Sequence, residues 1–463
     1  MRAINPATEE PLEDYAEHSS QQVDELLRRA GEQFRLWRET PMADRARLMK
    51  RAGSLLRERS AALSSLMTRE MGKPITGSEA EIEKCAAACD FFAEHAPSYL
   101  ARETIASDAS RSYVCYEPLG AVLAIMPWNF PFWQVFRFAA PALMAGNVGV
   151  LKHAPNVPGC GLAIESVFRD AGFPSGVFTT LLVDTPIVES IIRGPVIRAV
   201  TLTGSGRAGM AVAAQAGAAL KKSVLELGGS DAFIVLPDAD VEATARAAAA
   251  ARCVNSGQSC IAAKRFIVVG GADRFAGHLA REMDRLAVGD PTDRRTDVGP
   301  LARLDLLENL HDQVRRSVDA GARLITGGRR LPCKGYFYAP TVLADVRPGM
   351  AAFDEETFGP VAAVIAARDA DDAVRLANAS RYGLGASIWG RDVALAERLA
   401  GRIESGSVFI NGPVKSDPRL PFGGIKDSGY GRELSQPGIR EFVNVKTVWV
   451  KETESPNTPR RPE

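Results

Sequence analysis

The sequence predicts an α/β protein in which two parallel sheets are each covered by helices. Between residues 119 and 228, short apolar runs alternate with stretches long enough to form a helix, which is typical of a parallel sheet wrapped by helices. The same alternation returns between residues 232 and 411. A chain of 463 residues is also too long for one ordinary hydrophobic core, so we expect two or three packed units.

The predicted elements follow one another in three groups. Residues 20–100 carry apolar positions at helical spacing and predict a helical lead-in. Five apolar runs predict the strands of the first sheet, at Ala121–Met126, Val148–Leu151, Val177–Leu182, Ala199–Leu202 and Ser223–Leu227. The second unit begins with a strand at Ala232–Leu236, an alanine-rich helix to about residue 253 and a strand at Arg265–Val269. The polar, proline-rich residues 452–463 predict a disordered tail.

Composition argues against several classes of partner. The 56 lysines and arginines balance 56 aspartates and glutamates, so no net charge attracts nucleic acid or an anionic membrane. No apolar run approaches the roughly 20 residues that span a bilayer, and the first residues lack a signal-peptide core. Seven cysteines without a repeating spacing argue against a disulfide framework, and we expect a cytoplasmic protein. Cys85 and Cys89 share a helix face with no further ligands nearby, so we expect helix packing and no metal site.

Cys260 lies in a segment suited to chemistry. It follows the alanine-rich helix in Asn255-Ser-Gly-Gln-Ser-Cys-Ile-Ala-Ala-Lys264, where Gly257 allows a tight turn. The thiolate is the reactive form of cysteine, and a turn rich in backbone N–H groups lowers its pKa and binds an oxyanion. Taken alone, a single cysteine is more often a buried structural residue, so the segment only suggests a nucleophile.

Two polar residues follow predicted strands of the first sheet, where parallel sheets place their chemistry. Glu226 ends a strand before a Gly-Gly turn, and a partly desolvated carboxylate there has a raised pKa and can serve as a general base. Asn129 lies in Pro127-Trp-Asn-Phe-Pro131, where two prolines fix the chain and aim the amide as an oxyanion donor. The plainer alternatives are an exposed strand-end glutamate and a proline turn with an aromatic plug.

A glycine turn, Thr203-Gly-Ser-Gly206, joins a predicted strand to the helix Arg207–Leu220. The N–H groups at Gly204 and the Ser205 hydroxyl are placed to hold a phosphate at the helix N-terminus. The turn lacks the full G-x-G-x-x-G dinucleotide fingerprint, and glycine turns between strand and helix are common, so this motif alone is weak.

These segments occur together and in order with further landmarks. The full set is Pro127-Trp-Asn-Phe-Pro131, Lys152, Thr203-Gly-Ser205, Glu226-Leu-Gly-Gly229, Gly257-Gln-Ser-Cys260, Glu356-Thr-Phe-Gly-Pro360, Pro421-Phe-Gly-Gly-Ile-Lys426 and Ser428-Gly-Tyr-Gly-Arg-Glu433. With them the chain resembles the aldehyde dehydrogenases along nearly its whole length, leaving only the tail outside the likeness.

The resemblance implies an oxidoreductase that converts an aldehyde to a carboxylic acid through a cysteine thiohemiacetal and thioester. It makes Cys260 the nucleophile, Glu226 the general base, and Asn129 with the Cys260 backbone N–H the oxyanion hole. Because Glu226 is present, hydrolysis is favoured over acyl transfer to coenzyme A. A non-catalytic relative kept as a binding or structural protein is the rival hypothesis, and the presence of both Cys260 and Glu226 argues against it.

The resemblance also implies a nicotinamide dinucleotide as hydride acceptor. Six residues match positions that line the cofactor in the family: Trp128, Gly204, Ser205, Leu227, Glu356 and Phe358. Glu356 would lie at the nicotinamide-side ribose and Lys152 at the adenine-side ribose. Many NAD-specific relatives carry a glutamate three residues after this lysine, whereas this chain has Pro155, so no carboxylate there repels a 2′-phosphate. With only Lys152, and at most His153, as nearby cations, we expect both NAD and NADP to support turnover, with NAD modestly preferred.

Within the family, the chain is most similar to bacterial succinate-semialdehyde dehydrogenases. The likeness rests on Pro131-Phe-Trp-Gln-Val-Phe-Arg137, Lys152-His-Ala-Pro-Asn156 and the single cysteine followed by Ile-Ala-Ala. Arg137 matches an arginine that binds the substrate carboxylate in such enzymes, but Val254 stands where some of them have a second arginine. Arg419 is the candidate for that missing charge, against the plainer role of a surface residue. Another small aldehyde is the alternative substrate.

The family fold implies three parts. We expect a doubly wound dinucleotide-binding domain at residues 1–100 and 119–228 and an α/β catalytic domain at 229–435. A small β oligomerisation flap would combine residues 101–118 with 436–451, including a final strand at Phe442–Val450. The flap implies a homodimer or homotetramer.

Overall fold

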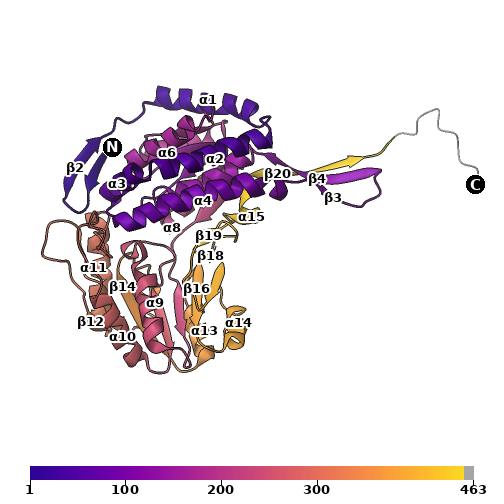
Figure 1. The fold of residues 1–463 in the computed structure, drawn as a ribbon. Helices are drawn as coiled ribbons and strands as arrows, with labels where there is room; N and C mark the ends of the chain where they lie inside the picture. The colour runs from indigo at the N-terminus through magenta and orange to yellow at the C-terminus, as the bar shows by residue number, and fades with distance from the viewer. Residues whose placement is uncertain (453–463) are drawn as a thin grey trace, which may run out of the picture.

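Two large sheets hold most strands of the computed structural model, which describes residues 1–452. In Figure 1 the six-stranded sheet lies in the upper part of the molecule and the seven-stranded sheet in the lower part. One hydrophobic core surrounds the first sheet, and separate cores cover the two faces of the second. The predicted α/β architecture is confirmed. The predicted disordered tail lies outside the described residues from residue 453 onward.

A hairpin and four helices precede the first sheet. β1 (Arg2–Asn5) pairs antiparallel with β2 (Glu10–Asp14), a hairpin that no sequence pattern indicated. The helices lie where helical periodicity predicted them, at α1 (Ser20–Trp37), α2 (Met42–Glu58), α3 (Ser60–Met71) and α4 (Ile75–Tyr99). α1 begins at a capping box, in which the side chains of Ser19 and Gln22 each accept a hydrogen bond from the other's backbone N–H.

The first sheet has the strand order β19-β9-β8-β5-β6-β7. Its strands are β5 (Ala121–Ile125), β6 (Val148–Lys152), β7 (Phe178–Thr180), β8 (Ile197–Thr203), β9 (Lys222–Glu226) and β19 (Gly429–Tyr430), and its helices are α5 (Trp133–Met144), α6 (Pro158–Asp170), η1 (Thr185–Ile187), α7 (Val188–Arg193) and α8 (Gly206–Ala218). All pairs are parallel except β19 with β9. The chain runs outward from β5 to β7 and returns to β8, so its direction reverses between β5 and β8. Ligands bind at such a switch point, beyond the carboxyl ends of the strands.

The second sheet has the order β12-β13-β14-β11-β10-β16-β17, with only the edge strand β12 antiparallel. Its strands are β10 (Ala232–Val235), β11 (Arg265–Val269), β12 (Arg323–Thr326), β13 (Thr341–Ala344), β14 (Val361–Ala367), β16 (Gly385–Trp389) and β17 (Ser407–Ile410). Helices α9 (Val241–Cys253), η2 (Val254–Gly257), α10 (Ala272–Asp284), α11 (Leu304–Asp319), α12 (Ala351–Asp354), α13 (Ala370–Asn378) and α14 (Val393–Ala400) accompany it, with the short pair β15 (Tyr382–Gly383) and β18 (Ile425–Lys426) beside it.

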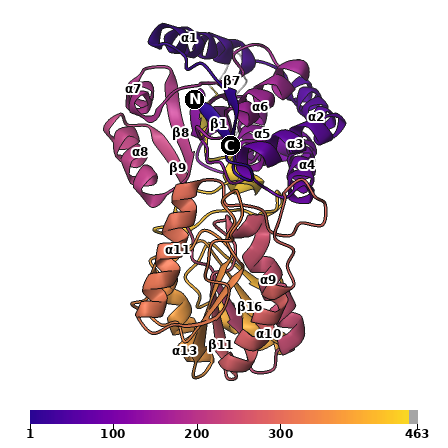
Figure 2. The same cartoon turned by 90° about the vertical axis from the view of Figure 1, so that its left-hand side faces the viewer.

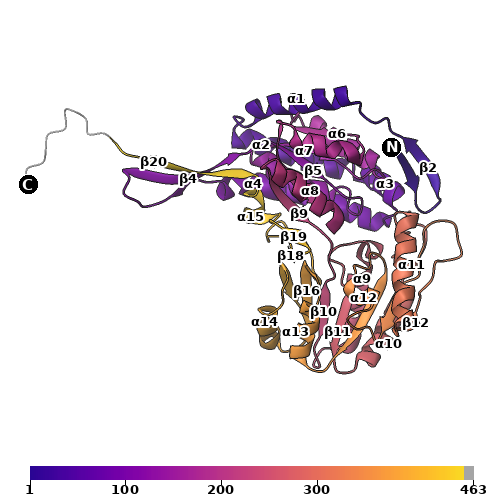
Figure 3. The ribbon, with the colours of Figure 1, turned by 180° about the vertical axis from the view of Figure 1, so that it is seen from behind.

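A three-stranded antiparallel arm projects from the body of the molecule (Figures 1 and 3). It contains β3 (Glu103–Thr104), β4 (Arg111–Pro118) and β20 (Val443–Val450), and α15 (Ser435–Ile439) leads into it. β4 and β20 pair along eight residues each, from Pro118 with Val443 to Arg111 with Val450. The final strand lies within the predicted Phe442–Val450.

The two sheets are joined so that the carboxyl end of one leads into the amino end of the other. β9 ends at Glu226, and only residues 227–231 separate it from the start of β10 (Figure 3). In Figure 2, β9 lies in the upper unit and β11 and β16 lie in the lower one. β19 lies inside the segment predicted as catalytic domain, yet it pairs with β9 at the edge of the first sheet. Among residues 1–452, no helix is long and apolar enough to cross a membrane.

Candidate active site

Cys260 lies at a pocket of about 440 Å³ where the two large sheets meet. We call it the cysteine pocket. Eight of the predicted site residues line it: Trp128, Asn129, Gly204, Ser205, Leu227, Cys260, Glu356 and Phe358. They come from the segments after β5, β8 and β9 of the first sheet and before β11 and β14 of the second. The pocket therefore occupies the switch point between β5 and β8.

The backbone before Cys260 turns through three consecutive left-handed residues. Asn255, Ser256 and Gly257 have φ angles of 53°, 55° and 77°. A Cβ atom on Gly257 would lie 2.3 Å from the carbonyl carbon of Gly359, so only glycine fits there. This contact fixes residues 255–264, which we call the cysteine loop, against the segment that carries Glu356 and Phe358.

The side chain of Lys264 holds the cysteine loop together. Its ammonium is buried and donates hydrogen bonds to three carbonyl oxygens, of Ser259 (3.1 Å), Cys260 (2.9 Å) and Ala262 (3.1 Å). The same Nζ lies 3.8 Å from Oε1 of Glu356. No sequence motif marked Lys264. Its position directly before a buried strand, where a charged residue is unusual, could have identified it.

The Asn129 amide points at the cysteine loop. Its Nδ2 donates to the carbonyl of Gln258 at 3.1 Å, while the Asn255 side chain donates to the Asn129 carbonyl at 2.6 Å. One hydrogen of the Asn129 amide remains for another acceptor. Among residues 1–452, the backbone N–H of Cys260 has no backbone acceptor. Both groups can therefore donate to a carbonyl oxygen beside the thiol, as an oxyanion hole requires.

Burial keeps the Cys260 thiol protonated. It raises the pKa of the thiol to about 12, against the opposing positive charges of Arg137 and Lys264. The reactive thiolate is therefore a minor species in this state, and attack requires either more positive charge nearby or transfer of the proton to a base.

Glu226 closes the end of β9 and is almost fully buried. Burial raises the pKa of its carboxyl well above the ordinary range; the charge of Arg137 opposes this rise and that of Glu433 adds to it. Neither carboxylate oxygen has a hydrogen-bond partner among the described residues. A desolvated carboxyl without fixed partners is free to accept a proton, which suits a general base.

Arg137 lies at the centre of these charges, on α5. Its guanidinium forms an ion pair with Glu433, donates to Thr203 Oγ1 at 3.3 Å and lies 4.5 Å from the ring centroid of Phe422. The side chain is buried and does not line the cysteine pocket. The structure thus gives Arg137 an internal anionic partner, which the sequence analysis did not foresee.

Aromatic and acidic side chains form the outer wall of the cysteine pocket. The rings of Trp128 and Phe358 meet edge to face, with centroids 5.7 Å apart. Oε1 of Glu356 accepts a hydrogen bond from the N–H of Gly229 at 2.9 Å. A Cβ on Gly228 would lie 2.5 Å from the other Glu356 oxygen, so the Gly-Gly turn makes room for this carboxylate.

Cys260 and Asn129 at the cysteine pocket, with the desolvated Glu226 at the end of β9 outside its lining, match the landmarks of one family, and comparison with known proteins identifies it. The model of the aldehyde dehydrogenase family matches residues 1–448. The chain belongs to the aldehyde dehydrogenase family.

Relatives of this aldehyde dehydrogenase share most of its length. It is 50% identical to the probable NADP(+) succinate-semialdehyde dehydrogenase of Synechocystis sp., over 97% of this chain and 99% of that protein. It is also 50% identical to the NAD(P)+ succinate semialdehyde dehydrogenase Sad of Escherichia coli, over 96% and 97%. A solved succinic semialdehyde dehydrogenase from Streptococcus pyogenes, in complex with NADP+, superimposes with a TM-score of 0.95 at 35% identity, over 97% and 100% of the two chains.

The residues that we predicted at the adenine-side ribose lie outside the cysteine pocket. Lys152 ends β6 and is buried; burial lowers the pKa of its ammonium and the negative charge of Asp184 opposes this. His153 is within hydrogen-bond distance of the Pro131 carbonyl, 2.9 Å away, and burial lowers the pKa of its imidazole to about 4. His153 is therefore neutral near pH 7, which leaves Lys152 as the cation of this run. Pro155 is exposed in the turn that follows.

Arg419 is not brought together with the other predicted residues. Its side chain is 72% exposed, and its guanidinium binds Asp417 of the same loop at 2.5 and 2.8 Å. It lines neither the cysteine pocket nor the pocket described next. Arg419 therefore lies where the alternative interpretation, that of a surface loop residue, places it.

A second pocket, of about 450 Å³, is lined by two neighbours of Asn129: Phe130, the next residue in the chain, and Asn255, whose side chain donates to the Asn129 carbonyl. We call it the lysine pocket, because Lys73 and Lys84 line it. Val254 lines it too, at the position where some relatives carry an arginine.

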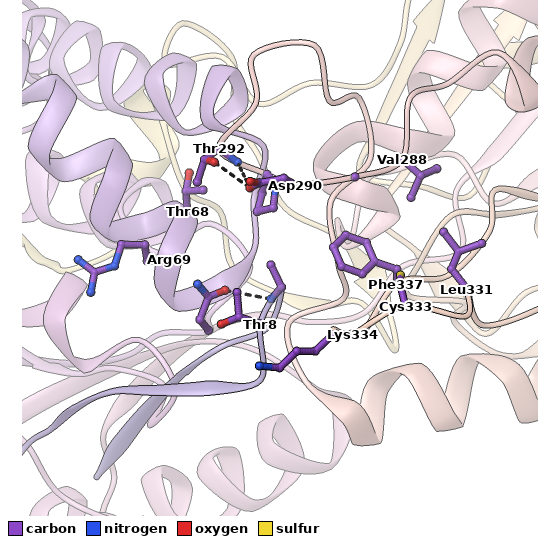
Figure 4. Close-up of a pocket in the computed structure, with 14 residues that line it drawn as sticks. Thr8, Thr68, Arg69, Val288, Asp290, Thr292, Leu331, Cys333, Lys334 and Phe337 are labelled. Atoms are coloured by element: carbon purple, nitrogen blue, oxygen red, sulfur yellow. Dashed lines mark hydrogen bonds between the residues drawn. The ribbon is translucent and has the colours of Figure 1, made fainter.

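A third pocket, of about 440 Å³, lies between the β1–β2 turn and the loops of the second unit (Figure 4). Asp290 in its wall accepts hydrogen bonds from the N–H and the hydroxyl of Thr292, both at 2.8 Å. Lys334, which also lines it, already pairs with Glu10 at 2.9 Å. None of the predicted site residues lies there. Among the described residues, no cluster of His, Cys, Asp or Glu could hold a metal ion.

Proposed function

We propose that this aldehyde dehydrogenase oxidises succinate semialdehyde to succinate, with NADP or NAD as hydride acceptor. The observation that carries the proposal is the presence, beside the cysteine pocket, of a second, lysine-lined pocket that reaches Phe130 and Asn255, the neighbours of Asn129. A cationic pocket beside the nucleophile suits an aldehyde that ends in a carboxylate. The names of the relatives in Synechocystis and Escherichia coli support this substrate.

The first half-reaction uses Cys260 and Asn129. The Cys260 thiol releases its proton to solvent and the thiolate adds to the aldehyde carbon. The new oxyanion accepts hydrogen bonds from the Asn129 Nδ2 and the Cys260 backbone N–H. Bound in the cysteine pocket, the cofactor supplies the acceptor for the hydride that leaves this carbon. Loss of the hydride re-forms the carbonyl and leaves a thioester on the Cys260 sulfur.

The second half-reaction uses Glu226. Its carboxylate accepts a proton from water, the resulting hydroxide equivalent adds to the thioester carbon, and the C–S bond breaks to release the acid. The thiol then returns to the state from which the next cycle starts. The same oxyanion donors serve both halves, because both pass through a tetrahedral adduct at one carbon.

The cysteine pocket suits the nicotinamide half of a dinucleotide. Its volume falls in the range of ligand pockets, roughly 300–1,000 Å³, and Gly204 and Ser205 stand at the N-terminus of the 13-residue helix α8, where N–H groups attract phosphate. We propose that Lys152 contacts the adenine-side ribose and that both NAD and NADP are used. One lysine near the negative charge of Asp184 gives neither cofactor a strong advantage.

We also propose a cytoplasmic location and a homodimer or homotetramer. All seven cysteines are unpaired, and a thiolate nucleophile needs a reducing compartment. The arm formed by β3, β4 and β20 exposes apolar side chains, with Val445 61% and Trp449 49% accessible, which suits an interface with a second copy.

An assay of the purified protein with paired aldehydes tests the proposal. Reduced-cofactor absorbance would be followed with succinate semialdehyde and with butanal, each with NAD and with NADP. We expect kcat/KM for succinate semialdehyde to exceed that for butanal by about a hundredfold, as a desolvated ion pair provides. The two cofactors should differ by less than about a hundredfold. Equal kcat/KM values for the two aldehydes would contradict the assigned substrate, and no reduction of either cofactor would contradict the activity.

A further inference from the structure

The segment that carries Asn129 is fixed by side chains from other elements. We call residues 127–132, which lead from β5 into α5, the asparagine loop. The Asn255 side chain donates to the Asn129 carbonyl at 2.6 Å. The neutral His153 ring is within hydrogen-bond distance of the Pro131 carbonyl, 2.9 Å from its Nε2. The carbonyl groups of the asparagine loop are thus held at two points.

The N–H groups at the far end of the asparagine loop are held by Glu81, on α4. Its Oε1 accepts hydrogen bonds from the N–H groups of Phe132 and Trp133, both at 2.9 Å. These groups lie at the N-terminus of α5, where the cap residue Phe132 has no side-chain acceptor to offer. Glu81 therefore supplies the cap that α5 lacks, and its negative charge suits the positive end of the helix dipole.

Lys73 connects this cap to the asparagine loop a second time. Its ammonium forms an ion pair with Glu81 and lies 3.7 Å from the ring centroid of Phe130, the residue directly after Asn129. Lys73 and Glu81 are 2% and 3% exposed. A buried charge is costly unless it is paired and hydrogen-bonded, so movement of the loop away from either group is opposed. An exposed ion pair would resist such movement far less.

We propose that the Lys73–Glu81 pair is a positioning device for Asn129, which keeps the Asn129 Nδ2 directed at the oxyanion formed beside Cys260. The inference rests on the oxyanion role proposed for Asn129 and names the residues that give this amide its direction. A donor displaced by about 1 Å can cost about a hundredfold in rate. Because every aldehyde forms the same oxyanion, the pair acts on the addition step whatever group the far end of the aldehyde carries.

The test replaces the pair without leaving a buried charge unpaired. Lys73→Met/Glu81→Met removes the charges and the acceptor, whereas Lys73→Met/Glu81→Gln removes the charges but keeps an amide oxygen for the two N–H groups. The rate of the first cofactor reduction is followed by stopped-flow absorbance at saturating butanal, which has no carboxylate for the lysine pocket to bind. We expect this rate to fall by about tenfold to a hundredfold in K73M/E81M. The loss in K73M/E81Q should be at least about threefold smaller, because the acceptor is restored.

The amplitude of the first reduction separates positioning from folding. It counts active sites, so a loss of folded protein lowers the amplitude and leaves the rate of the remaining sites unchanged. A pair that only joins α4 to α5 would therefore change the amplitude alone. An unchanged rate in K73M/E81M would overturn the inference.

Asn129→Ala provides the background that shows whether the pair acts through the amide. This substitution alone should lower the rate by about a hundredfold or more. Added to it, Lys73→Met/Glu81→Met should cost less than about a further threefold, because no donor remains to be misplaced. An equal fold loss with and without Asn129 would overturn the inference and leave the oxyanion role standing.

Failure of the oxyanion role gives a different result. An unchanged rate in Asn129→Ala alone would refute that role, and the inference with it. Should K73M/E81M not fold, K73M/E81Q is carried through the same cycle. Its loss should then disappear in the Asn129→Ala background, and an equal loss in both backgrounds would overturn the inference.

Discussion

Arg137 is the residue through which the charged groups of the active site act on one another. Burial raises the pKa of both the Cys260 thiol and the Glu226 carboxyl, and the Arg137 charge opposes the rise in each. The same guanidinium is tied to Glu433 and stacked over Phe422, which fixes its place. One buried, positioned cation therefore acts on the pKa of both the proposed nucleophile and the proposed base.

Removing this cation should cost stability as well as activity. In Arg137→Met, the buried Glu433 loses its counter-charge, so we expect the free energy of unfolding to fall by about 3–5 kcal/mol. Adding Glu433→Gln removes the orphaned charge and should restore most of that loss. Urea unfolding of both variants measures the difference, and equal destabilisation of the single and double variants would show that the ion pair is not the reason.

Cys260 and Glu226 should fail at different steps. Cys260→Ala removes the nucleophile, and we expect turnover to fall by at least about four orders of magnitude. Glu226→Gln keeps the nucleophile but loses the base, so the acyl group should accumulate on Cys260. Mass spectrometry of the Glu226→Gln protein mixed with aldehyde and cofactor would detect the trapped thioester. Undiminished turnover in Cys260→Ala would refute the assignment of the nucleophile.

The pKa of Cys260 sets a pH dependence for its alkylation in the absence of cofactor. With the pKa raised to about 12, the thiol is protonated below that pH, so the thiolate fraction rises tenfold for each pH unit between 7 and 10. The rate of iodoacetamide labelling at Cys260, followed on its peptide by mass spectrometry, should rise in the same proportion. Labelling that levels off near an ordinary thiol pKa of about 8.5 would contradict the raised value.

Residue roles were predictable from sequence where a local motif carries them. The loop around Cys260 and the segment around Asn129 are continuous, so their residue types and spacing point to their chemistry. Lys264 has no such pattern, because its role comes from burial and from its hydrogen bonds to the carbonyl oxygens of the cysteine loop. Arg137 was identified as a charged site residue, but its pairing with Glu433 depends on a contact between distant segments.

At the scale of elements, the left-handed turn before Cys260 is the most constrained part of the site. In Gly257→Ala, the added methyl would meet Gly359 at 2.3 Å and the φ of 77° would be strained. We expect unfolding free energy to fall by at least about 2 kcal/mol and acylation of Cys260 to slow. Gly277→Ala, in the interior of α10 with open space around it, is the control and should stabilise by up to about 1 kcal/mol. Similar stabilities for both variants in urea would contradict the constraint.

The strands that the sequence predicted best are those buried on both faces. β5 and β6 are continuous apolar runs, and each was predicted within about a residue of its observed ends. β1, β2 and β19 escaped prediction for the opposite reason. They are short, partly exposed and antiparallel, and β19 pairs with a strand about two hundred residues away. A distant contact creates the β19 pairing, so no local periodicity marks it, and the β1–β2 hairpin is local but its strands are too short and too exposed to show one.

At the scale of the whole molecule, two pockets lie near the junction of the two sheets. The first sheet contributes the carboxyl ends of β5, β8 and β9 to the cysteine pocket, and the lysine pocket lies between α4 and the start of the cysteine loop. Neither sheet alone holds both Glu226 and Cys260. The proposed catalysis therefore depends on how the two halves of the chain pack. Sequence motifs identify the residues but do not show this packing.

The projecting arm exposes apolar side chains that a monomer has no reason to expose, so we expect it to form an interface. β20 is the edge strand of the arm, and Val445 on it is 61% accessible. An exposed edge strand with apolar side chains is a template for pairing with another copy. Val445→Asp places a charge on that surface and should shift the assembly toward the monomer in size-exclusion chromatography with light scattering. Val393→Asp, at a 47% accessible position on α14 in the lower unit, away from the arm (Figure 1), is the matched control and should retain the mass of the unaltered protein. A monomeric unaltered protein, or a Val445→Asp protein that keeps its full assembly, would show that this edge of the arm is not the interface.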